Sequence, residues 1–490
     1  MSSLSTPSLL DLAAKSLLRN EAMAIAALEL LPVELFPPML KAAVTGECRE
    51  TLQAMVQAWP LALLPLGALM TEQQSYQDIL WAALRGLEDL LAKKVRPRRW
   101  KLQMLDLRAG AHQEFWIVWA GSPARGSENS ESEVEPPKAK RQKVEVAGMV
   151  ERAPVEVLMD LCLNSTAPDE FLTALLKKVR QRHGQLRLCC KKLQVFSVPM
   201  QNIKKVLKTV QLHSVQNLEM NCTWKLSTLG RFARFLGQMV NLRRFLLCHL
   251  QVLPSHRSRA KEEQYICQFA APFSGLCHLR ELRLDSISFL EGRLHHLLRC
   301  LTTHLEILSI TNCLLEESDL IYLSQCHYTS QLRDLSLSGV SLTTMNIGPL
   351  RILLEHTSAT LRDLDLDECG IMDAQFSSIL PALGRCARLE TFSFCGNPIS
   401  IAVLESLLRH TAGLAHLNHM LYAAPLESYE EDHGTLHLGR LAQLHTRLTR
   451  IMQEVGRSGI VWFSANLCPQ CGDRTFYDPN PVLCPCYTPA

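Results

Sequence analysis

One motif, L-x-x-L-x-L, recurs along this 490-residue chain and limits its fold more than any other feature. The regular copies start 26 to 29 residues apart, at Leu279, Leu305, Leu332, Leu361 and Leu389. Three of these copies end in a Cys or an Asn at the same position of the motif: Cys313, Cys369 and Asn397. A period of 20 to 29 residues with this leucine spacing is typical of stacked strand–helix units.

The period predicts an α/β fold, a leucine-rich-repeat solenoid (horseshoe). Each repeat is expected to add one strand to a parallel sheet on the concave side and one helix on the convex side. Weaker copies begin at Val215, Leu242 and Leu414, and a further copy begins at Leu102. The irregular stretch 253–270 is interpreted as an insertion in the array.

Composition divides the chain into five expected segments. They are a helical N-terminal cap (1–95), a first repeat (96–121), a disordered linker (122–150), the solenoid (151–456) and a short Cys-rich tail (457–490). Residues 7–95 show leucine and alanine at helical spacing, with Asn20 as the expected cap of a second helix. The linker is expected to bulge from the solenoid, and a helix over 435–455, stopped by Gly456, is expected to close the open end.

Charge and hydropathy argue against a membrane protein or a nucleic-acid-binding one. The formal net charge is only +3, so no chain-wide attraction to nucleic acid is implied. The longest apolar stretch, "AWPLALLPLGALM", is too short and too rich in proline to span a bilayer. The first residues do not resemble a signal peptide, so the eighteen cysteines are expected to be mostly reduced.

The linker contains a basic cluster next to an acidic run. "SPARGSENSESEVEPP" is followed by "KAKRQKV", in which Lys138, Lys140, Arg141 and Lys143 lie close together. This pattern predicts a nuclear-import signal, and the alternative is a solvated linker with alternating charge blocks. We therefore expect residence in the nucleus, with a share in the cytoplasm.

The first helix matches a short partner-binding pattern. Ser8, Leu9, Ala13 and Leu17, with Leu12 on the same side, fit the degenerate BC box of elongin-binding proteins. In that mode a leucine enters a pocket, and a small residue one turn later allows close approach of the backbones. "LPVEL" follows, and Leu31, Pro32 and Leu35 have the spacing of a cullin-2 box. The alternative is a helical cap over the first repeat, and the two interpretations are compatible.

Longer motifs resemble one known family. "SLLRNEAMAIAALELLPVELFPP", "VRPRRWKLQMLDLR", "LRLCCKKL", "PLESYEEDHGTLHL" and "CPQCGDRTFYDPNPVLCPC" are similar to the PRAME family, and the resemblance runs from residue 8 to 490. It implies a substrate receptor of a cullin-2 RING ubiquitin ligase, with elongin B, elongin C, cullin-2 and a RING subunit as partners. It also implies repression of retinoic-acid-receptor signalling, opposing differentiation and apoptosis, with that receptor as a further partner. The rival hypothesis is a transcriptional co-repressor scaffold without a ligase role.

No enzyme motif is found, so any chemistry is expected to belong to the partners. Five L-x-x-L-L boxes, of the kind that nuclear receptors bind, begin at Leu87, Leu172, Leu294, Leu350 and Leu404. The convex helices of a leucine-rich repeat generate this spacing by themselves. We therefore interpret the boxes as core.

The concave side is the expected site of a protein substrate. Alternate strand residues face the same way, which puts Asp363, Asp365 and Asp367 in one acidic ladder with Asp334 on the preceding repeat. Arg244 lies toward the N-terminal end and is expected near a bound C-terminus. These residues favour an extended segment with basic side chains, and the alternative is a solvated face without a ligand.

The tail carries four thiols with metal-ligand spacing. Cys468 and Cys471 are followed by Cys484 and Cys486, the number that a closed structural zinc site needs. The C-x-C spacing of the second pair is tighter than usual, and the other cysteines show that this chain tolerates thiols without metal. One structural zinc is the expected cofactor, and no organic cofactor is expected.

Overall fold

The computed structural model describes residues 9–70, 76–93, 97–119, 153–164, 169–250, 259–429, 436–456, 460–466, 474, 476–478 and 480–482. These residues form two compact units. The first unit comprises 1–161, 166–191 and 204–211, and the second comprises 162–165, 192–203 and 212–490. Within the described residues, no helix combines the length and the apolar character that crossing a bilayer requires.

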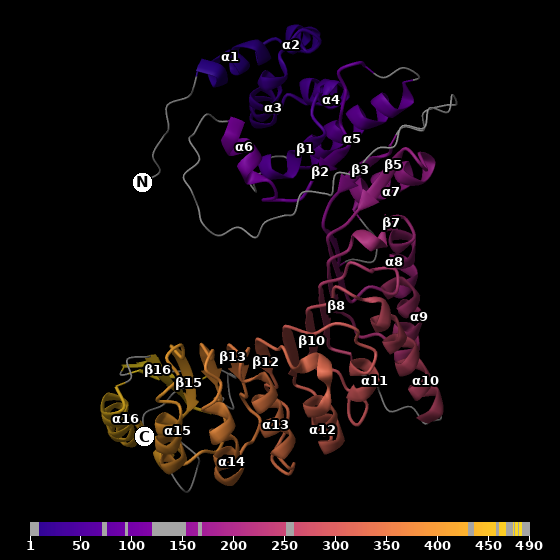
Figure 1. The fold of residues 1–490 in the computed structure, drawn as a ribbon. Helices are drawn as coiled ribbons and strands as arrows, with labels where there is room; N and C mark the ends of the chain where they lie inside the picture. Colours follow the sequence, from indigo (N-terminus) through magenta and orange to yellow (C-terminus); the bar gives the residue numbers. More distant parts are fainter. Residues whose placement is uncertain are drawn as a thin grey trace. The chain divides into compact units, whose positions relative to one another are not determined.

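The first unit combines helices with a five-stranded parallel sheet (Figure 1). Its helices are α1 (Leu9–Leu18), α2 (Glu21–Ala27), the 3₁₀ turns η1 (Val33–Leu35) and η2 (Leu66–Leu69), α3 (Phe36–Thr45), α4 (Arg49–Ala58), α5 (Tyr76–Ala92), α6 (Gln113–Trp119) and α7 (Glu170–Gln181). The sheet has the order β1 (Leu63–Pro65), β2 (Met104–Asp106), β3 (Val155–Leu158), β5 (Leu186–Cys189) and β7 (Val210–Gln211).

The structure differs from the sequence prediction for this unit at one point and agrees with it at another. Strand β1 lies inside the segment that was expected to be all helix, because "LLP" pairs in parallel with β2. β2 and β3 are neighbours in the same sheet although the linker separates them in sequence, which agrees with the expectation that the linker bulges from the repeat array. The linker therefore interrupts one sheet, and residue 150 is not a boundary between two compact units.

The second unit contains a thirteen-stranded sheet with helices on one side (Figure 1). Its strands are β4 (Leu161–Leu163), β6 (Lys192–Phe196), β8 (Asn217–Asn221), β9 (Arg244–Cys248), β10 (Glu281–Asp285), β11 (Ile307–Thr311), β12 (Asp334–Ser336), β13 (Asp363–Asp365), β14 (Thr391–Ser393), β15 (His419–Ala423), β16 (Ile460–Ser464), β17 (Phe476–Asp478) and β18 (Asn480–Val482). We call the side of this sheet opposite the helices the open face.

Helices and 3₁₀ turns connect these strands. They are α8 (Met200–Leu207), η3 (Leu212–Ser214), α9 (Leu226–Leu236), α10 (Arg259–Ala270), η4 (Ala271–Gly275), α11 (Leu294–Leu298), α12 (Glu317–Gln325), η5 (His327–Thr329), α13 (Gly348–Thr357), α14 (Asp373–Leu383), α15 (Ile401–His410), η6 (Leu426–Ser428) and α16 (Leu438–Glu454). The mixed α/β repeat with a parallel sheet, as the leucine period predicted, is confirmed.

The Cys and Asn positions of the repeat satisfy backbone groups in the turns. Nδ2 of Asn397 donates to the Leu366 and Phe394 carbonyls, at 2.8 and 2.9 Å, and its Oδ1 accepts from the Ile371 amide at 2.9 Å. The thiol of Cys369 donates to the Leu337 carbonyl at 3.2 Å. Buried backbone groups need such partners, so these side chains join successive repeats. Burial raises the pKa of the Cys369 thiol, which is inert and structural.

Two details at the C-terminal end differ from the prediction. The last copy of the motif begins at Leu417 and not at Leu414. Met420 and Tyr422 occupy the buried strand positions of β15, and Met420 pairs with Phe392 of the preceding copy. The sheet also continues beyond α16. β16 pairs in parallel with β15, and β17 and β18 follow in antiparallel. α16 therefore does not end the solenoid, and part of the tail extends the sheet.

Candidate functional site: protein-binding surfaces

Helix α1 exposes the side chains that match the BC box. Leu9 is 86% exposed and Leu12 is 50% exposed, while Ala13 is exposed and Leu17 half-buried. Ala14 and Leu18 lie on the opposite face, which is buried where α1 packs against α3. One face of α1 thus belongs to the core of the first unit, and the other presents leucines to solvent.

Further apolar side chains lie uncovered close behind α1 in the sequence. Met23 and Leu30 are 61% and 84% exposed, and Val33 in η1 is 37% exposed. Burying a leucine contributes about 1.5–3 kcal/mol, so solvent exposure of several large apolar residues is typical of an interface. The sequence prediction missed Met23 and Leu30. Met23 lies on α2 away from its buried residue Ala24, and Leu30 lies in the turn that follows the helix.

Hydrogen bonds hold this region in place. Oδ1 of Asn20 accepts from the Met23 amide at 3.1 Å, which confirms the predicted cap of α2. Oε2 of Glu21 accepts from the amide and hydroxyl of Thr51, at 3.0 and 3.1 Å, and joins α2 to α4. Arg99 donates to the Leu31 carbonyl at 2.8 Å. These contacts fix the backbone before and within "LPVEL".

The predicted cullin segment lies at the surface. Pro32 is exposed, whereas Leu31 before η1 and Leu35 at its last position are half-buried. A groove of about 450 Å³ lies between the end of α2, α4 and residues 97–99. Lys93, Arg98 and Arg99 line it together with Glu29, which makes one wall basic.

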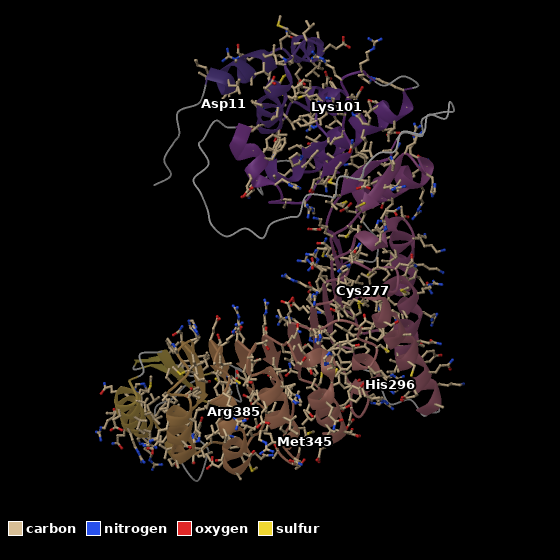
Figure 2. All side chains as sticks on the ribbon, in the orientation of Figure 1. Asp11, Lys101, Cys277, His296, Met345 and Arg385 are labelled. Carbon is tan, nitrogen blue, oxygen red and sulfur yellow. The ribbon has the colours of Figure 1, made fainter. Side chains whose placement is uncertain are left out.

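On the open face, polar and buried residues alternate as predicted. Asp363 and Asp365 are half-buried, whereas Leu364 between them is buried. Parallel register puts Asp334 beside Asp363, and Ser336 beside Asp365. Figure 2 shows side chains projecting from both the strand side and the helix side of this unit.

The aspartates differ in their partners. Oδ2 of Asp365 accepts from the Ser336 hydroxyl at 2.8 Å, and Oδ1 of Asp367 accepts from the Ser393 hydroxyl and the Cys395 amide, both at 2.6 Å. Asp334 lies 3.5 Å from Arg283. The Asp363 amide donates to the Arg333 carbonyl at 2.9 Å, but among the described residues its carboxylate takes part in no hydrogen bond or ion pair. The ladder is therefore partly structural, and Asp363 is its most available carboxylate.

Arg244 is also partnered. Its Nε lies 3.1 Å from Oε2 of Glu281, whose other oxygen accepts from Arg283 at 2.6 Å. The Arg244 side chain is nevertheless 69% exposed, so it remains accessible on β9, the fourth strand from the N-terminal edge of the sheet. An anionic ligand there would compete with Glu281.

Two aspartates of the ladder, Asp334 and Asp367, have raised pKa values. Burial raises the pKa of Asp334, and the neighbouring carboxylates of Asp363, Glu281 and Asp365 raise it further against the opposing effect of Arg283. Burial also raises the pKa of Asp367, although Ser393 and the Cys395 amide favour its charged form. Like charges on adjacent strands disfavour ionisation, and a bound cation would relieve this cost.

The five L-x-x-L-L boxes are core. All fifteen of their motif leucines are at most 6% exposed, with Leu294, Leu297 and Leu298 of α11 at 0%. Their interpretation as convex-helix core is confirmed. A nuclear receptor has no access to these leucines in the folded chain.

Several predicted site residues lie outside the described part of the chain. They are Ser8 of the BC box, the basic cluster Lys138, Lys140, Arg141 and Lys143, and the four thiols Cys468, Cys471, Cys484 and Cys486. Each stays a prediction.

Comparison with known proteins covers nearly the whole sequence. A family model described as "PRAME N-terminal domain" matches residues 6–116, and "PRAME C-terminal domain" matches 155–486. The human protein PRAME family member 12 is 47% identical over 99% of this chain and 98% of its own length. Human PRAME family member 8 is 44% identical over 99% of this chain and all of its own length.

Among solved structures, similarity is found to the yeast complex of Rad7 and Elc1. The matched chain is 17% identical, with a TM-score of 0.37, over 51% of this chain and 62% of that one.

Proposed function

We propose that this chain, which belongs to the PRAME family, is a substrate receptor that elongins B and C link to cullin-2 and a RING ubiquitin ligase. In this role the first unit binds the ligase, and the open face of the second unit binds a protein substrate. The receptor positions a substrate for ubiquitin transfer and needs no catalytic residue of its own.

The observation that carries the proposal is the two-faced character of α1. Ala14 and Leu18 already fill its core contact, so among the described residues of the first unit nothing requires Leu9, Leu12 or Ala13 to be apolar. A helix with an unfilled leucine stripe suits helix-in-groove binding, in which Leu9 is the anchor and Ala13 the point of close approach.

Elongin binding tests this role directly. Pull-down of the purified elongin B–C complex should be lost for Leu9→Ala and for Ala13→Glu, because the first removes the anchor and the second buries an unpaired charge. Leu314→Ala is the matched control, since this leucine of the second unit is 60% exposed. Undiminished binding by both α1 variants would remove the proposed docking.

Cullin-2 binding is tested separately at "LPVEL". Pro32→Ala combined with Leu35→Ala should preserve elongin binding and reduce recovery of cullin-2. Loss of both partners together would instead indicate a disrupted first unit.

The substrate proposal concerns an extended segment with basic side chains. Asp363 and its acidic neighbours Asp334 and Asp365 form a negative stretch on strands β12 and β13, which favours Arg or Lys. Selection from a random-peptide display library should enrich basic residues, and Asp363→Asn should reduce that enrichment. Selected peptides without a charge preference would place the substrate site elsewhere.

For localisation we propose the nucleus, with a share in the cytoplasm, on the basis of the "KAKRQKV" cluster. Repression of retinoic-acid-receptor signalling is also proposed. If the receptor is a partner, it must contact a surface other than the buried L-x-x-L-L boxes. The alternative role as a co-repressor scaffold predicts that Leu9→Ala retains repression in a reporter assay, whereas the ligase role predicts its loss.

A further inference from the structure

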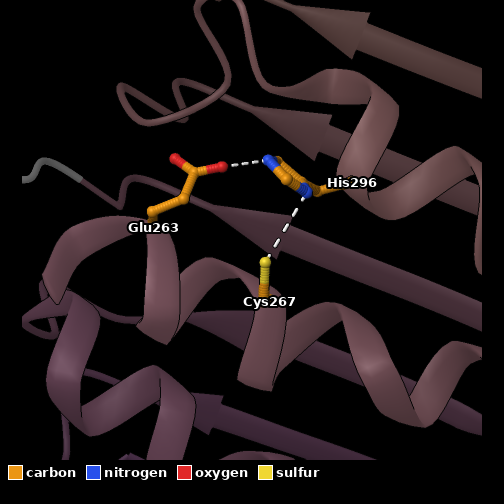
Figure 3. A group of neighbouring side chains, drawn as sticks. All are labelled: Glu263, Cys267 and His296. Carbon is orange, nitrogen blue, oxygen red and sulfur yellow. Dashed lines mark hydrogen bonds and ion pairs between the residues drawn. The ribbon is translucent and has the colours of Figure 1, made fainter. Parts of the chain in front are cut away.

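A thiol, an imidazole and a carboxylate meet between helices α10 and α11, on the side of the second unit away from the open face (Figure 3). Glu263 and Cys267 are four residues apart on α10 and therefore share one face of that helix. His296 on α11 completes the group, and its side chain is only 8% exposed. One donor atom from each residue lies within 4.8 Å of the others.

The two ring nitrogens of His296 have different partners. Nδ1 lies 3.6 Å from Sγ of Cys267, and Nε2 contacts a carboxylate oxygen of Glu263 (Figure 3). With the Nε2 proton donated to Glu263, the lone pair of Nδ1 points toward the sulfur. Metal-binding histidines commonly use this arrangement, in which a carboxylate holds the second nitrogen and orients the ring.

The distance between sulfur and nitrogen fits a tetrahedral metal. Zn–S bonds of about 2.3 Å and Zn–N bonds of about 2.0–2.1 Å separate the two donors by about 3.5–3.6 Å at the tetrahedral angle. The observed 3.6 Å matches this edge without movement of either residue. Burial lowers the pKa of His296, the nearby His295 and Arg299 lower it further, and the Glu263 carboxylate acts in the opposite direction.

We propose that Cys267 and His296 bind one zinc-like divalent cation, with Glu263 as the residue that orients His296. The cation takes the place of the thiol proton, which is released to solvent as the metal–sulfur bond forms. Cys267 and Glu263 are half-buried, so water can reach the site and complete the coordination. The site is separate from the cysteines of the tail and independent of the ligase role.

The positive charge of Arg299 should weaken cation binding at this site, so its removal should increase the affinity for the metal. Its Nη2 lies 3.9 Å from the Cys267 sulfur, and the residue is exposed. A divalent cation that replaces the thiol proton adds one net positive charge to the site. Removing the Arg299 charge should therefore tighten binding about fivefold, the effect of two unit charges about 4 Å apart in water. Misfolding does not readily produce such a gain.

The experiment uses the reduced, full-length protein and cobalt(II) as the probe, because a cobalt–thiolate bond gives a charge-transfer absorption. Tail cysteines contribute equally to all variants and cancel in difference spectra. Cys267→Ser should lose a part of the absorption that Cys277→Ser retains. Cys277 is an exposed thiol that contacts the Gly275 carbonyl instead of a histidine.

Affinities complete the test. Glu263→Gln should weaken cobalt binding at this site by about 10–100-fold, as for other residues that orient a metal ligand, and Arg299→Gln should strengthen it. Zinc should displace the cobalt. Equal spectra for Cys267→Ser and the unmodified chain, or weaker binding by Arg299→Gln, would overturn the proposal.

Discussion

The hydroxyl of Ser336 donates a hydrogen bond of 2.8 Å to Oδ2 of Asp365 on the neighbouring strand. The other oxygen of this carboxylate accepts from the Asp367 amide at 3.0 Å. Asp365 thus joins β12 to β13 and also shapes the turn that follows β13. Negative charge on the open face therefore has a structural use in addition to any role in binding.

The first prediction compares the contributions of Asp367, whose carboxylate is hydrogen-bonded, and Asp363, whose carboxylate is not, to the free energy of unfolding. Asp367→Ala should lower the free energy of unfolding by about 1–3 kcal/mol, because the Ser393 hydroxyl and the Cys395 amide lose their acceptor. Asp363→Ala should change it by about 0.5 kcal/mol or less. Urea unfolding of both variants measures the difference, and equal losses would contradict the distinction.

The second prediction concerns pH. The pKa of Asp334 is raised above its ordinary 3.8, so the stability that its proton contributes is present below 3.8 and lost as the pH rises through the raised value. At pH 7 the folded carboxylate is unfavourable, and Asp334→Asn should stabilise the chain by about 0.5–1 kcal/mol. This gain should shrink as the pH approaches 4. If Asp334→Asn stabilised the chain equally at pH 7 and pH 4, the charge of the Asp334 carboxylate would not be the cause.

The third prediction compares the two faces of α1. Leu18→Ala should increase hydrogen exchange along α1, because truncation of a buried leucine costs about 2–5 kcal/mol in a core and removes the contact with α3. Leu9→Ala should leave exchange nearly unchanged while abolishing elongin binding. Faster exchange in Leu9→Ala would mean that its binding defect reflects unfolding.

The fourth prediction is one zinc per chain in the tail. Native mass spectrometry of chelator-free protein should detect a zinc ion that Cys471→Ser with Cys484→Ser removes, because four thiolates make a closed site. The Cys267→Ser background excludes a contribution from the proposed site at Cys267 and His296. A metal-free tail that resists proteolysis would contradict this prediction.

The fifth prediction concerns import. Replacement of Lys138, Lys140, Arg141 and Lys143 by alanine should move a fluorescent fusion of the chain from the nucleus to the cytoplasm. Alanine replacement of Lys204, Lys205 and Lys208 provides a control of similar charge. Unchanged nuclear signal would favour the solvated-linker interpretation.

The sequence alone determined the repeat architecture and the face of each strand. Leucines at a fixed period have to be buried, and the strand period of two then exposes Asp363 and Asp365 on the opposite side. The same logic identified the leucines of the L-x-x-L-L boxes as core. These features depend only on the spacing of residues along the chain, which can be read directly from the sequence.

Only the tertiary structure decided features that depend on neighbours far apart in the chain. Strand β1 exists because "LLP" has β2 beside it, and its three residues carry no period that could reveal a strand. Leu9 and Leu18 are both leucines of one helix, and only the position of α3 decides which one is exposed. Likewise, His296 reaches Cys267 across 29 residues of sequence because two repeat helices pack side by side. Spacing determines which residues share a face, and packing determines what that face contacts.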